Sequence, residues 1–389
     1  MSQSSANKIK PMVLVALSAA LMFFYGFILG GMQLVLDDIA NLFQTGQTGK
    51  GMLVSAQHIT SALAPVCMGL LADKIGKKKV LVAFSAVFGI GCAVCGFSNT
   101  IAVYTFGITL TGAGYSVCES LSSAVLTDLD SKNGIRYINI CQCLLSVGAV
   151  ISPLLLQASI RYLGADWRLA FYVCAAAFLI LAGLLSCTVF PKPVLKETTK
   201  RSGSYRQFLT VVFVCLVLAM IFYVGLENGF GYFVNTLFAD HLQSGNLGAY
   251  AISLYWAGMA LCRLVCSLKA YKPIPMLLGC FFLSAVLLAV LAVCPWGGAS
   301  LACCFLVGAA FAPVWSTLAA LAAAQNPEHS GAAIGLMSTG CGLGGIVFPT
   351  VMGYVSEHYR ITTAFFLLCV TACVGLVLCF TVKYRQKNQ

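Results

Sequence analysis

Long apolar runs alternate with short polar segments along the whole chain. Each run is about 20 residues long or longer, which is the length that a helix needs to cross the hydrocarbon core of a bilayer. The pattern predicts an all-α membrane protein, because a backbone in lipid has to satisfy its own hydrogen bonds. The twelve expected transmembrane helices lie at approximately 11–36, 51–72, 79–98, 100–127, 137–160, 168–190, 208–237, 248–268, 274–294, 299–324, 331–354 and 362–382.

The composition and the distribution of charge agree with this pattern. Charged residues make up 9% of the chain and hydrophobic residues 60%, whereas ordinary soluble domains carry roughly 25% charged residues. A cytoplasmic N-terminus puts nineteen of the 23 basic residues on the cytoplasmic side and leaves Lys50, Arg161, Arg168 and Arg360 outside. By the positive-inside rule, we expect a multi-pass protein of the cytoplasmic membrane with both termini cytoplasmic. The net charge of +11 reflects this bias and does not indicate nucleic acid as a partner.

The chain also repeats itself at a constant offset. Gly112 in the fourth run corresponds to Gly308 in the tenth, and Pro153 in the fifth corresponds to Pro349 in the eleventh; 308 − 112 and 349 − 153 both equal 196. We therefore predict two pseudo-symmetric six-helix bundles, residues 1–190 and 207–389, joined by a cytoplasmic linker at 191–206. Duplicated bundles of this kind occur in transporters that hold a solute near the bilayer midplane.

A charged loop between the second and third runs has the sequence GLLADKIGKKK. It resembles the loop signature of the major facilitator superfamily and stands between the same two spans. The resemblance implies the twelve-helix fold of that family and a gating motif in which Asp73 holds the cytoplasmic side closed near Ser330. Glycine at position 69 would permit close helix approach. The residues of the predicted gating motif are Gly69, Asp73, Lys74, Gly76 and Lys77.

A narrower resemblance is carried by three motifs: Gly112-x-Gly114 followed by Glu119, the segment YVGLE at 223–227, and the segment YWAGM at 255–259 with Arg263. They are similar to the fucose permease branch, whose members are proton-coupled sugar transporters. The resemblance implies a role for Glu119 in coupling or in substrate binding. That branch has an acid in its first helix, and this chain has Gln33 at the corresponding position.

Glu119 stands out on physical grounds as well. It lies about nine residues, or roughly 13 Å, from the cytoplasmic end of its span. A carboxylate at that depth is costly and usually marks an ion or substrate pathway. We predict that Glu119 carries the coupling proton, with Glu227 as the second candidate in the other half. The alternative is a protonated glutamate that hydrogen-bonds between helices.

Polar and aromatic residues in the spans are candidates for solute binding, because a sugar needs hydrogen bonds for its hydroxyl groups and an aromatic ring for its apolar face. Trp315 stands at the position that the offset of 196 pairs with Glu119. The alternative for each residue is helix packing, since polar side chains also hold membrane helices together. The candidates are Gln33, Tyr115, Asn139, Gln142, Asn228, Tyr232, Asn235, Trp256 and Trp315.

The resulting prediction is a secondary active transporter that moves a small polar solute, with sugars as one class, by alternating access and proton symport. The runner-up is a proton-coupled exporter of a small amphiphilic metabolite or drug, and a non-transporting sensor or an intramembrane enzyme is a more distant alternative. The chain has no HExxH segment, phosphate loop or paired nucleophile and base, which are the motifs of several enzyme classes. We expect no enzyme activity, no cofactor and no metal. The expected partners are a small-molecule substrate, protons and the lipid bilayer, and the expected state is a monomer.

Overall fold

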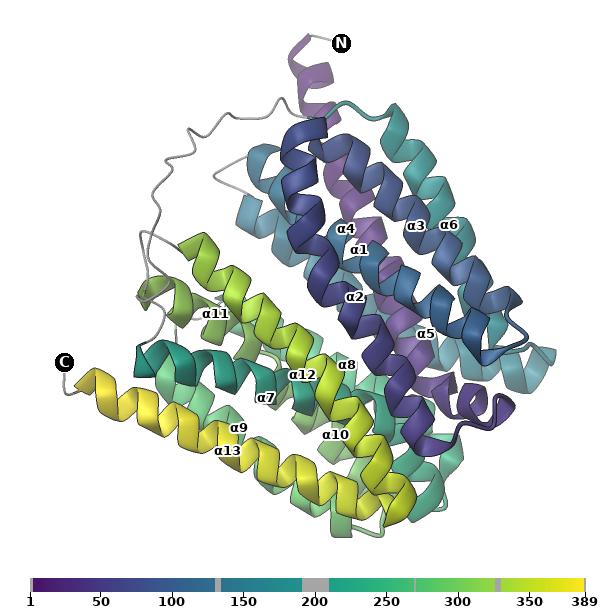
Figure 1. The fold of residues 1–389 in the computed structure, drawn as a ribbon, viewed down its shortest axis with the longest axis vertical. Helices are drawn as coiled ribbons and strands as arrows, with labels where there is room; N and C mark the ends of the chain where they lie inside the picture. Colours follow the sequence, from purple (N-terminus) through teal and green to yellow (C-terminus); the bar gives the residue numbers. More distant parts are fainter. Residues whose placement is uncertain (1–2, 130–133, 191–209, 269–270, 326–329, 388–389) are drawn as a thin grey trace. The chain divides into compact units, whose positions relative to one another are not determined.

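The computed structural model describes residues 3–129, 134–190, 210–268, 271–325 and 330–387. Within these ranges every predicted apolar run is helical over most of its length and no strand occurs, which confirms the all-α fold class. Eleven helical segments are long and apolar enough to cross a membrane, and α2 supplies the remaining predicted span. The helices (Figure 1) are α1 Gln3–Leu42, α2 Gly46–Ile75, α3 Lys77–Phe97, α4 Ile101–Leu129, α5 Gly134–Leu163, α6 Arg168–Cys187, α7 Val211–Thr236, η2 Leu237–His241, η3 Gly245–Leu247, α8 Gly248–Leu268, α9 Pro273–Val293, α10 Gly297–Phe311, α11 Val314–Gln325, α12 Ser330–His358 and α13 Ile361–Lys387.

The tenth predicted span is interrupted between α10 and α11. The break falls at Ala312 and Pro313. Proline has no amide hydrogen and its ring clashes with the preceding turn, so a helix ends or bends where it occurs. The two short helices together still form one candidate span of 29 residues, Gly297–Gln325.

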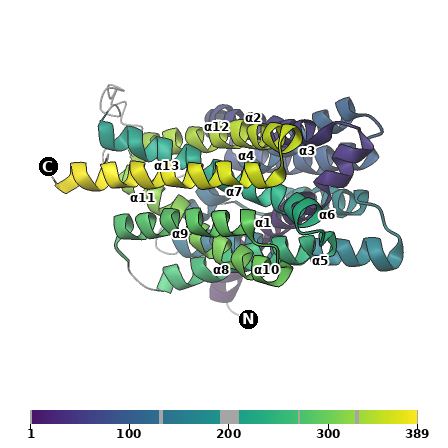
Figure 2. The ribbon, with the colours of Figure 1, turned by 90° about the horizontal axis from the view of Figure 1, so that it is seen from below.

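The chain forms two compact units. The first consists of Met1–Met32 and Ala56–Thr198, and the second of Gln33–Ser55 and Thr199–Gln389. In the first unit α3 packs against α4 and α6, and in the second α7 packs against α12 and α13, while α9 lies beside α13 (Figures 1 and 2). The boundary between the units does not fall in the predicted linker alone. The C-terminal end of α1 and the N-terminal end of α2 belong to the second unit, together with the later helices.

Hydrogen bonds explain why the first part of α2 belongs to the second unit. The backbone amide of Thr48 donates to Glu357 Oε2 at 2.7 Å, and Ser55 Oγ donates to the carbonyl of Ile346 at 2.5 Å. Both acceptors belong to α12. The N-terminal part of α2 is thus hydrogen-bonded to α12 at two places, about two helical turns apart.

The internal repeat is visible in how the helices approach one another. A Cβ atom at Gly112 would collide with the backbone carbonyl of Gln57 on α2, and a Cβ atom at Gly308 would collide with that of Tyr255 on α8. The glycines differ by 308 − 112 = 196 residues and their partners by 255 − 57 = 198. Each glycine therefore allows the same close contact in its own unit, which is the role of small residues between membrane helices.

A second glycine pair behaves in the same way. A Cβ atom at Gly148 on α5 would collide with the carbonyl of Phe23 on α1, and one at Gly344 on α12 would collide with that of Ile221 on α7. The glycine offset is again 344 − 148 = 196 and the partner offset 221 − 23 = 198. The repeat in the sequence thus corresponds to a repeated packing arrangement.

These contacts give a direct prediction. We expect Gly148→Ala to lower thermal stability, because the added methyl group must displace a backbone carbonyl, and overpacking of this kind costs about 1–3 kcal/mol. Gly183→Ala on α6 is the matched control, since no described atom lies within 4 Å of the position of its Cβ. Melting temperatures of the two purified variants measure the difference. Equal melting temperatures would contradict the packing role of Gly148.

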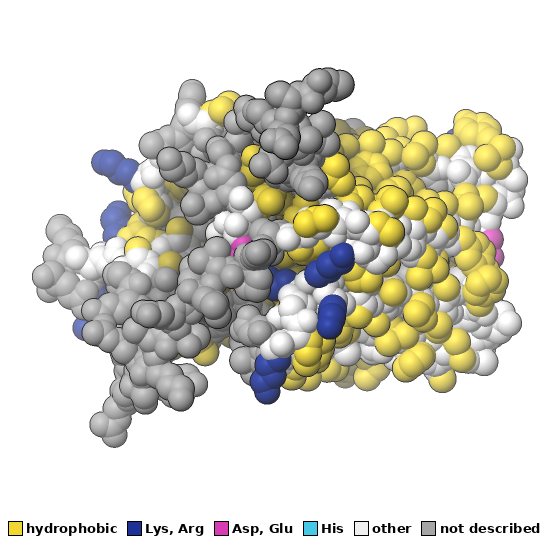
Figure 3. Space-filling model, turned by 90° about the horizontal axis from the view of Figure 1, so that it is seen from above, with side chains coloured by type: hydrophobic (Ala, Val, Ile, Leu, Met, Phe, Trp, Pro, Cys, Tyr) yellow, Lys and Arg dark blue, Asp and Glu magenta, His cyan; other side chains and the backbone are white. Residues whose placement is uncertain are grey.

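Hydrophobic side chains cover much of the described surface in the view of Figure 3. Large apolar residues on several helices are exposed, for example Phe97 at 71% and Val377 at 62%. In water such a surface would drive association, whereas in a bilayer it contacts lipid tails. The exposed apolar surface and the candidate spans together describe a multi-pass membrane protein.

Candidate functional site

The carboxylate of Glu119 lies on α4 of the first unit and meets a side chain of α5. Gln142 Nε2 donates a hydrogen bond of 2.9 Å to Glu119 Oε1, and both side chains are half-buried. The ion pairs among the described residues do not include Glu119. A neutral donor orients this carboxylate without cancelling its charge, and that arrangement suits a group that exchanges a proton or hydrogen-bonds a solute.

Two further candidates lie within one turn of this pair. Tyr115 precedes Glu119 by four residues, and its ring stacks on Tyr25 of α1 with centroids 3.2 Å apart and an angle of 6° between the planes. Asn139 precedes Gln142 by three residues on α5 and is exposed. The structure thus brings four predicted residues together on adjacent turns of α4 and α5, although one face of the Tyr115 ring is covered by Tyr25.

The Gly112-x-Gly114 motif beside Glu119 has a packing role. A Cβ atom at Gly112 would collide with Gln57 on α2, and one at Gly114 would lie 2.6 Å from the Cβ of Phe88 on α3. The motif therefore lets α2 and α3 approach α4. It positions Glu119 by fixing the helix that carries it.

In the second unit, two of the predicted solute-binding residues bind each other. Trp256 Nε1 on α8 donates to Gln33 Oε1 on α1 at 2.9 Å, and both residues are 3% exposed. The Trp256 ring also packs at a steep angle to Tyr255, with centroids 5.5 Å apart. In this structure neither face of the Trp256 ring is open to a solute. Gln33, which stands where the fucose permease branch has an acid, is a buried, hydrogen-bonded amide.

This hydrogen bond can be tested by substitution. We expect Trp256→Phe to lower the free energy of unfolding by about 1–3 kcal/mol, because it leaves the buried Gln33 carbonyl without its donor. Adding Gln33→Leu removes the orphaned group, so the double variant should lose less stability than the sum of the two single variants. Thermal unfolding of the three variants supplies the comparison. Strictly additive losses would mean that the two side chains do not depend on each other.

The three candidates on α7 stand four and three residues apart and would share one face of the helix as a polar stripe, but they do not form one continuous surface. Asn228 is half-buried, Tyr232 is 1% exposed, and the Asn235 amide donates to Asp37 Oδ2 at 3.1 Å. Glu227 is half-buried. The ring in the middle of the stripe, Tyr232, is therefore buried. The amide at its end, Asn235, is hydrogen-bonded to α1.

Two buried tyrosines accompany Glu227. Tyr223 on α7 and Tyr255 on α8 are fully buried, and the charges of Glu227 and Arg263 act on both hydroxyl groups. The YVGLE motif and Arg263 thus contribute to one polar cluster inside the second unit.

The second unit also contains a buried ion pair that the sequence analysis missed. Lys50 Nζ on α2 donates to Asp37 Oδ1 on α1 and to Thr236 Oγ1 on α7, both at 2.6 Å. The Lys50 side chain is completely buried and the Asp37 side chain is 19% exposed. Thr236 Oγ1 also lies 3.0 Å from each oxygen of Asp37. We call Asp37, Lys50, Asn235 and Thr236 the Asp37–Lys50 centre.

The predicted span limits, which left Lys50 between two helices, are therefore wrong at this point. Hydropathy ended the first span at 36 and began the second at 51, but α1 continues to Leu42 and α2 begins at Gly46. Both charged residues lie in helices. Each lowers the free-energy cost of burying the other, because opposite charges compensate at short range. The sequence did contain a signal for this ion pair: an acid directly after the first predicted span and a lysine directly before the second.

The predicted gating motif is only partly described. Gly76 separates α2 from α3 and has a φ of 97°, a backbone conformation that glycine adopts without strain. Lys77 pairs with Asp128 Oδ2 of α4 at 2.5 Å, and Lys74 is exposed. The Asp73 side chain, residues 326–329 and the Ser330 side chain lie outside the described set.

The close helix approach expected at Gly69 stays a prediction, since no described atom lies within 4 Å of the position of a Cβ there. The partner of Lys77 is Asp128, an acid that the sequence analysis did not single out. The ion pair joins the start of α3 to the end of α4.

Trp315 on α11 remains partly open. It is 41% exposed, and its Nε1 donates to Cys341 Sγ of α12 at 3.3 Å.

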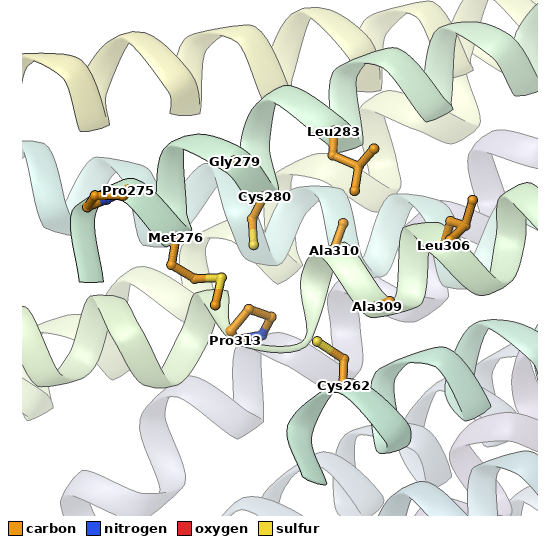
Figure 4. Close-up of a pocket in the computed structure, with 10 residues that line it drawn as sticks. All are labelled: Cys262, Pro275, Met276, Gly279, Cys280, Leu283, Leu306, Ala309, Ala310 and Pro313. Atoms are coloured by element: carbon orange, nitrogen blue, oxygen red, sulfur yellow. The ribbon is translucent and has the colours of Figure 1, made fainter. Parts of the chain in front are cut away.

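A separate cavity of about 400 Å³ lies between α8, α9 and α10 (Figure 4), lined by Cys262, Pro275, Met276, Gly279, Cys280, Leu283, Leu306, Ala309, Ala310 and Pro313. These side chains are apolar or thiol groups, so this cavity offers a sugar no strong hydrogen bonds. Among the described residues there is no cluster of three or more His, Cys, Asp or Glu side chains suited to a metal.

The fold and the buried polar groups define a multi-pass helical transporter built from two related sets of helices. The sequence model of the Major Facilitator Superfamily matches residues 14–349, and again residues 276–389. The chain therefore belongs to the major facilitator superfamily, as the loop motif indicated. Membership in a family of transporters also agrees with the prediction of a transporter and not an enzyme.

Individual relatives are distant. Myo-inositol transporter 2 of Schizosaccharomyces pombe is 25% identical over 164 residues, which are 42% of this chain and 29% of that protein. Sodium-dependent glucose transporter 1A of Mus musculus is 21% identical over 367 residues, 82% of this chain and 83% of that protein. The E. coli fucose:proton symporter FucP has a TM-score of 0.67 at 17% identity, covering 96% of this chain and 99% of that chain. This last likeness shows a shared fold.

Proposed function

We propose that this transporter imports a small polar solute, with sugars as the favoured class, together with a proton. The observation that carries the proposal is the hydrogen bond between Glu119 and Gln142. Glu119 is a carboxylate inside a membrane span whose partner in this structure is a neutral amide. Such a group can take up a proton or accept a hydroxyl hydrogen without first breaking an ion pair.

The neighbouring side chains support a polar solute. The amides of Asn139 and Gln142 on α5 both donate and accept hydrogen bonds. The names of two relatives, a myo-inositol transporter and a glucose transporter, concern polyhydroxylated solutes. Glu227, a half-buried carboxylate on α7, is proposed as the second proton-coupling group.

Solute uptake into proteoliposomes tests the proposal. An imposed pH gradient, acidic outside, should drive accumulation of at least one compound in a panel of sugars, polyols, nucleosides and organic acids, and a proton-conducting uncoupler should abolish it. Accumulation driven by a sodium gradient alone, or no gradient-dependent flux with any compound, would contradict proton symport.

The proposed location is the cytoplasmic membrane, with both termini cytoplasmic and the chain acting as a monomer. The charge asymmetry supports this orientation: with Lys50 buried, nineteen basic residues remain on the inner side against three outside (4 − 1). Cysteine labelling with a membrane-impermeant reagent checks the orientation. Because the chain has 19 cysteines of its own, the readout is the labelling beyond that of the wild type, and a Ser4→Cys variant should show such extra labelling only after the membrane is opened.

Export of an amphiphilic solute is the second candidate, and one observation favours it. The cavity between α8, α9 and α10 has an apolar lining that could accept a hydrophobic group. Efflux of a fluorescent amphiphile from energised vesicles, reduced by Ala309→Trp at this cavity, would support export. Efflux that is unchanged in the variant would remove the cavity from consideration as a drug site.

A further inference from the structure

The Asp37–Lys50 centre holds an ammonium group in the manner of a bound cation. Lys50 Nζ has two oxygen neighbours at 2.6 Å, Asp37 Oδ1 and Thr236 Oγ1. The ring of Phe233 faces the same nitrogen at 4.6 Å from its centroid, a distance at which a cation is attracted to an aromatic ring. The group is sealed from solvent, since the Lys50 side chain has no exposed surface.

The surroundings carry more negative than positive charge. Besides Asp37, the carboxylates of Asp38 on α1 and Asp240 on η2 act on the Lys50 ammonium. Asp37 is mostly buried, whereas Asp38 and Asp240 are exposed. Removal of the ammonium would leave Asp37 without its positive partner and two further carboxylates acting on the same position, and negative charge of this kind attracts small cations.

An oxygen atom without a hydrogen-bond partner among the described residues lies beside the centre. The Gln47 amide approaches Asp37, with Nε2 at 3.4 Å from Oδ1, and its Oε1 is buried without a hydrogen-bond partner among the described residues. A rotation of the amide by half a turn would exchange its nitrogen and oxygen, which are nearly the same in shape. The centre would then offer oxygen atoms from a carboxylate, a hydroxyl and an amide, the ligand types that hard cations prefer.

We propose that Asp37, Thr236 and Gln47 form a monovalent-cation site in which Lys50 is the resident, tethered cation. While the ammonium occupies the site, it neutralises Asp37 and excludes ions from solution. When the ammonium is absent, a free alkali-metal ion such as sodium binds to the same oxygens. Lys50 thereby determines which cations the transporter can respond to.

Thermal unfolding of the purified full-length protein tests this inference, with sodium chloride as the probe and choline chloride at equal concentration as the control for ionic strength. The wild-type protein should melt at the same temperature in both salts. Lys50→Met should gain a saturable rise of about 2–4 °C at a sodium concentration about ten times its dissociation constant. The double variant Asp37→Asn/Lys50→Met should lose this rise, because it lacks the carboxylate.

Two results would overturn the proposal: a wild-type protein that sodium stabilises as much as it does Lys50→Met, or a Lys50→Met variant that melts alike in sodium, lithium, potassium and choline. Should Lys50→Met not yield folded protein, Lys50→Gln keeps a polar group at the position and is judged by the same criteria. The measurement does not involve solute transport, so its result is independent of proton symport.

Discussion

Proteoliposomes that contain Glu119→Gln should lose solute accumulation driven by a pH gradient and keep solute counterflow. Glutamine preserves the size of the side chain and its ability to hydrogen-bond to Gln142, which donates to Glu119 at 2.9 Å in this structure. It cannot bind and release a proton at neutral pH. The accumulation ratio should therefore fall to about one, whereas exchange of labelled for unlabelled solute, which needs no net proton movement, should continue.

Asp166→Asn is a suitable control for this experiment. Asp166 is 50% exposed and pairs with Arg168 at 2.5 Å in the segment between α5 and α6, so its neutralisation should leave both assays unchanged. Normal gradient-driven accumulation in Glu119→Gln would show that this carboxylate does not carry the coupling proton. Loss of both activities would instead assign Glu119 to solute binding, which is the alternative that the sequence left open.

Lys50→Met should produce the largest loss of stability among the substitutions considered. Methionine retains most of the length of the lysine side chain but removes its charge, and the Asp37 carboxylate is left without its ammonium partner at 2.6 Å. Removing one partner of a buried ion pair costs about 3–5 kcal/mol, because the remaining charge is uncompensated. The melting temperature in sodium-free buffer should fall accordingly.

The double variant separates charge from packing. Asp37→Asn/Lys50→Met removes both charges and should recover much of the stability that the single variant loses, since a pair replaced by neutral groups is often close to neutral in stability. A double variant that is less stable than either single variant would contradict this account. Lys77→Met provides a comparison, because that lysine is 29% exposed beside Asp128 and a pair open to solvent contributes little.

Most of the fold followed from features that are local in the sequence. The length and spacing of the apolar runs predicted the long helices of the described ranges, though not the break between α10 and α11 or the short helices η2 and η3. The 196-residue offset of Gly112 and Gly308 pointed to two related sets of helices. These predictions succeeded because a bilayer requires each span to be long, apolar and helical by itself. The chain alone also predicted the family, through a loop whose residues are adjacent in sequence.

The helix ends and the side-chain partners were harder to predict. Hydropathy placed Asp37 and Lys50 in a loop, because it evaluates each charge separately and cannot register compensation by a residue thirteen positions away. Gln33 and Trp256 were predicted as solute contacts, and they are hydrogen-bonded to each other across 223 positions. In each case the partner lies on another helix, where only the packed structure brings the two groups together.

The sequence by itself thus determined the membrane class, the helices, the repeat and the family, since each is written in the composition and spacing of neighbouring residues. The tertiary structure decided which polar groups are already satisfied. It pairs Glu119 with Gln142, gives Lys77 to Asp128, and buries Lys50 against Asp37 and Thr236. The physical reason is that in a low-dielectric interior a polar or charged group is stable only with a partner, and partners are chosen by packing between helices.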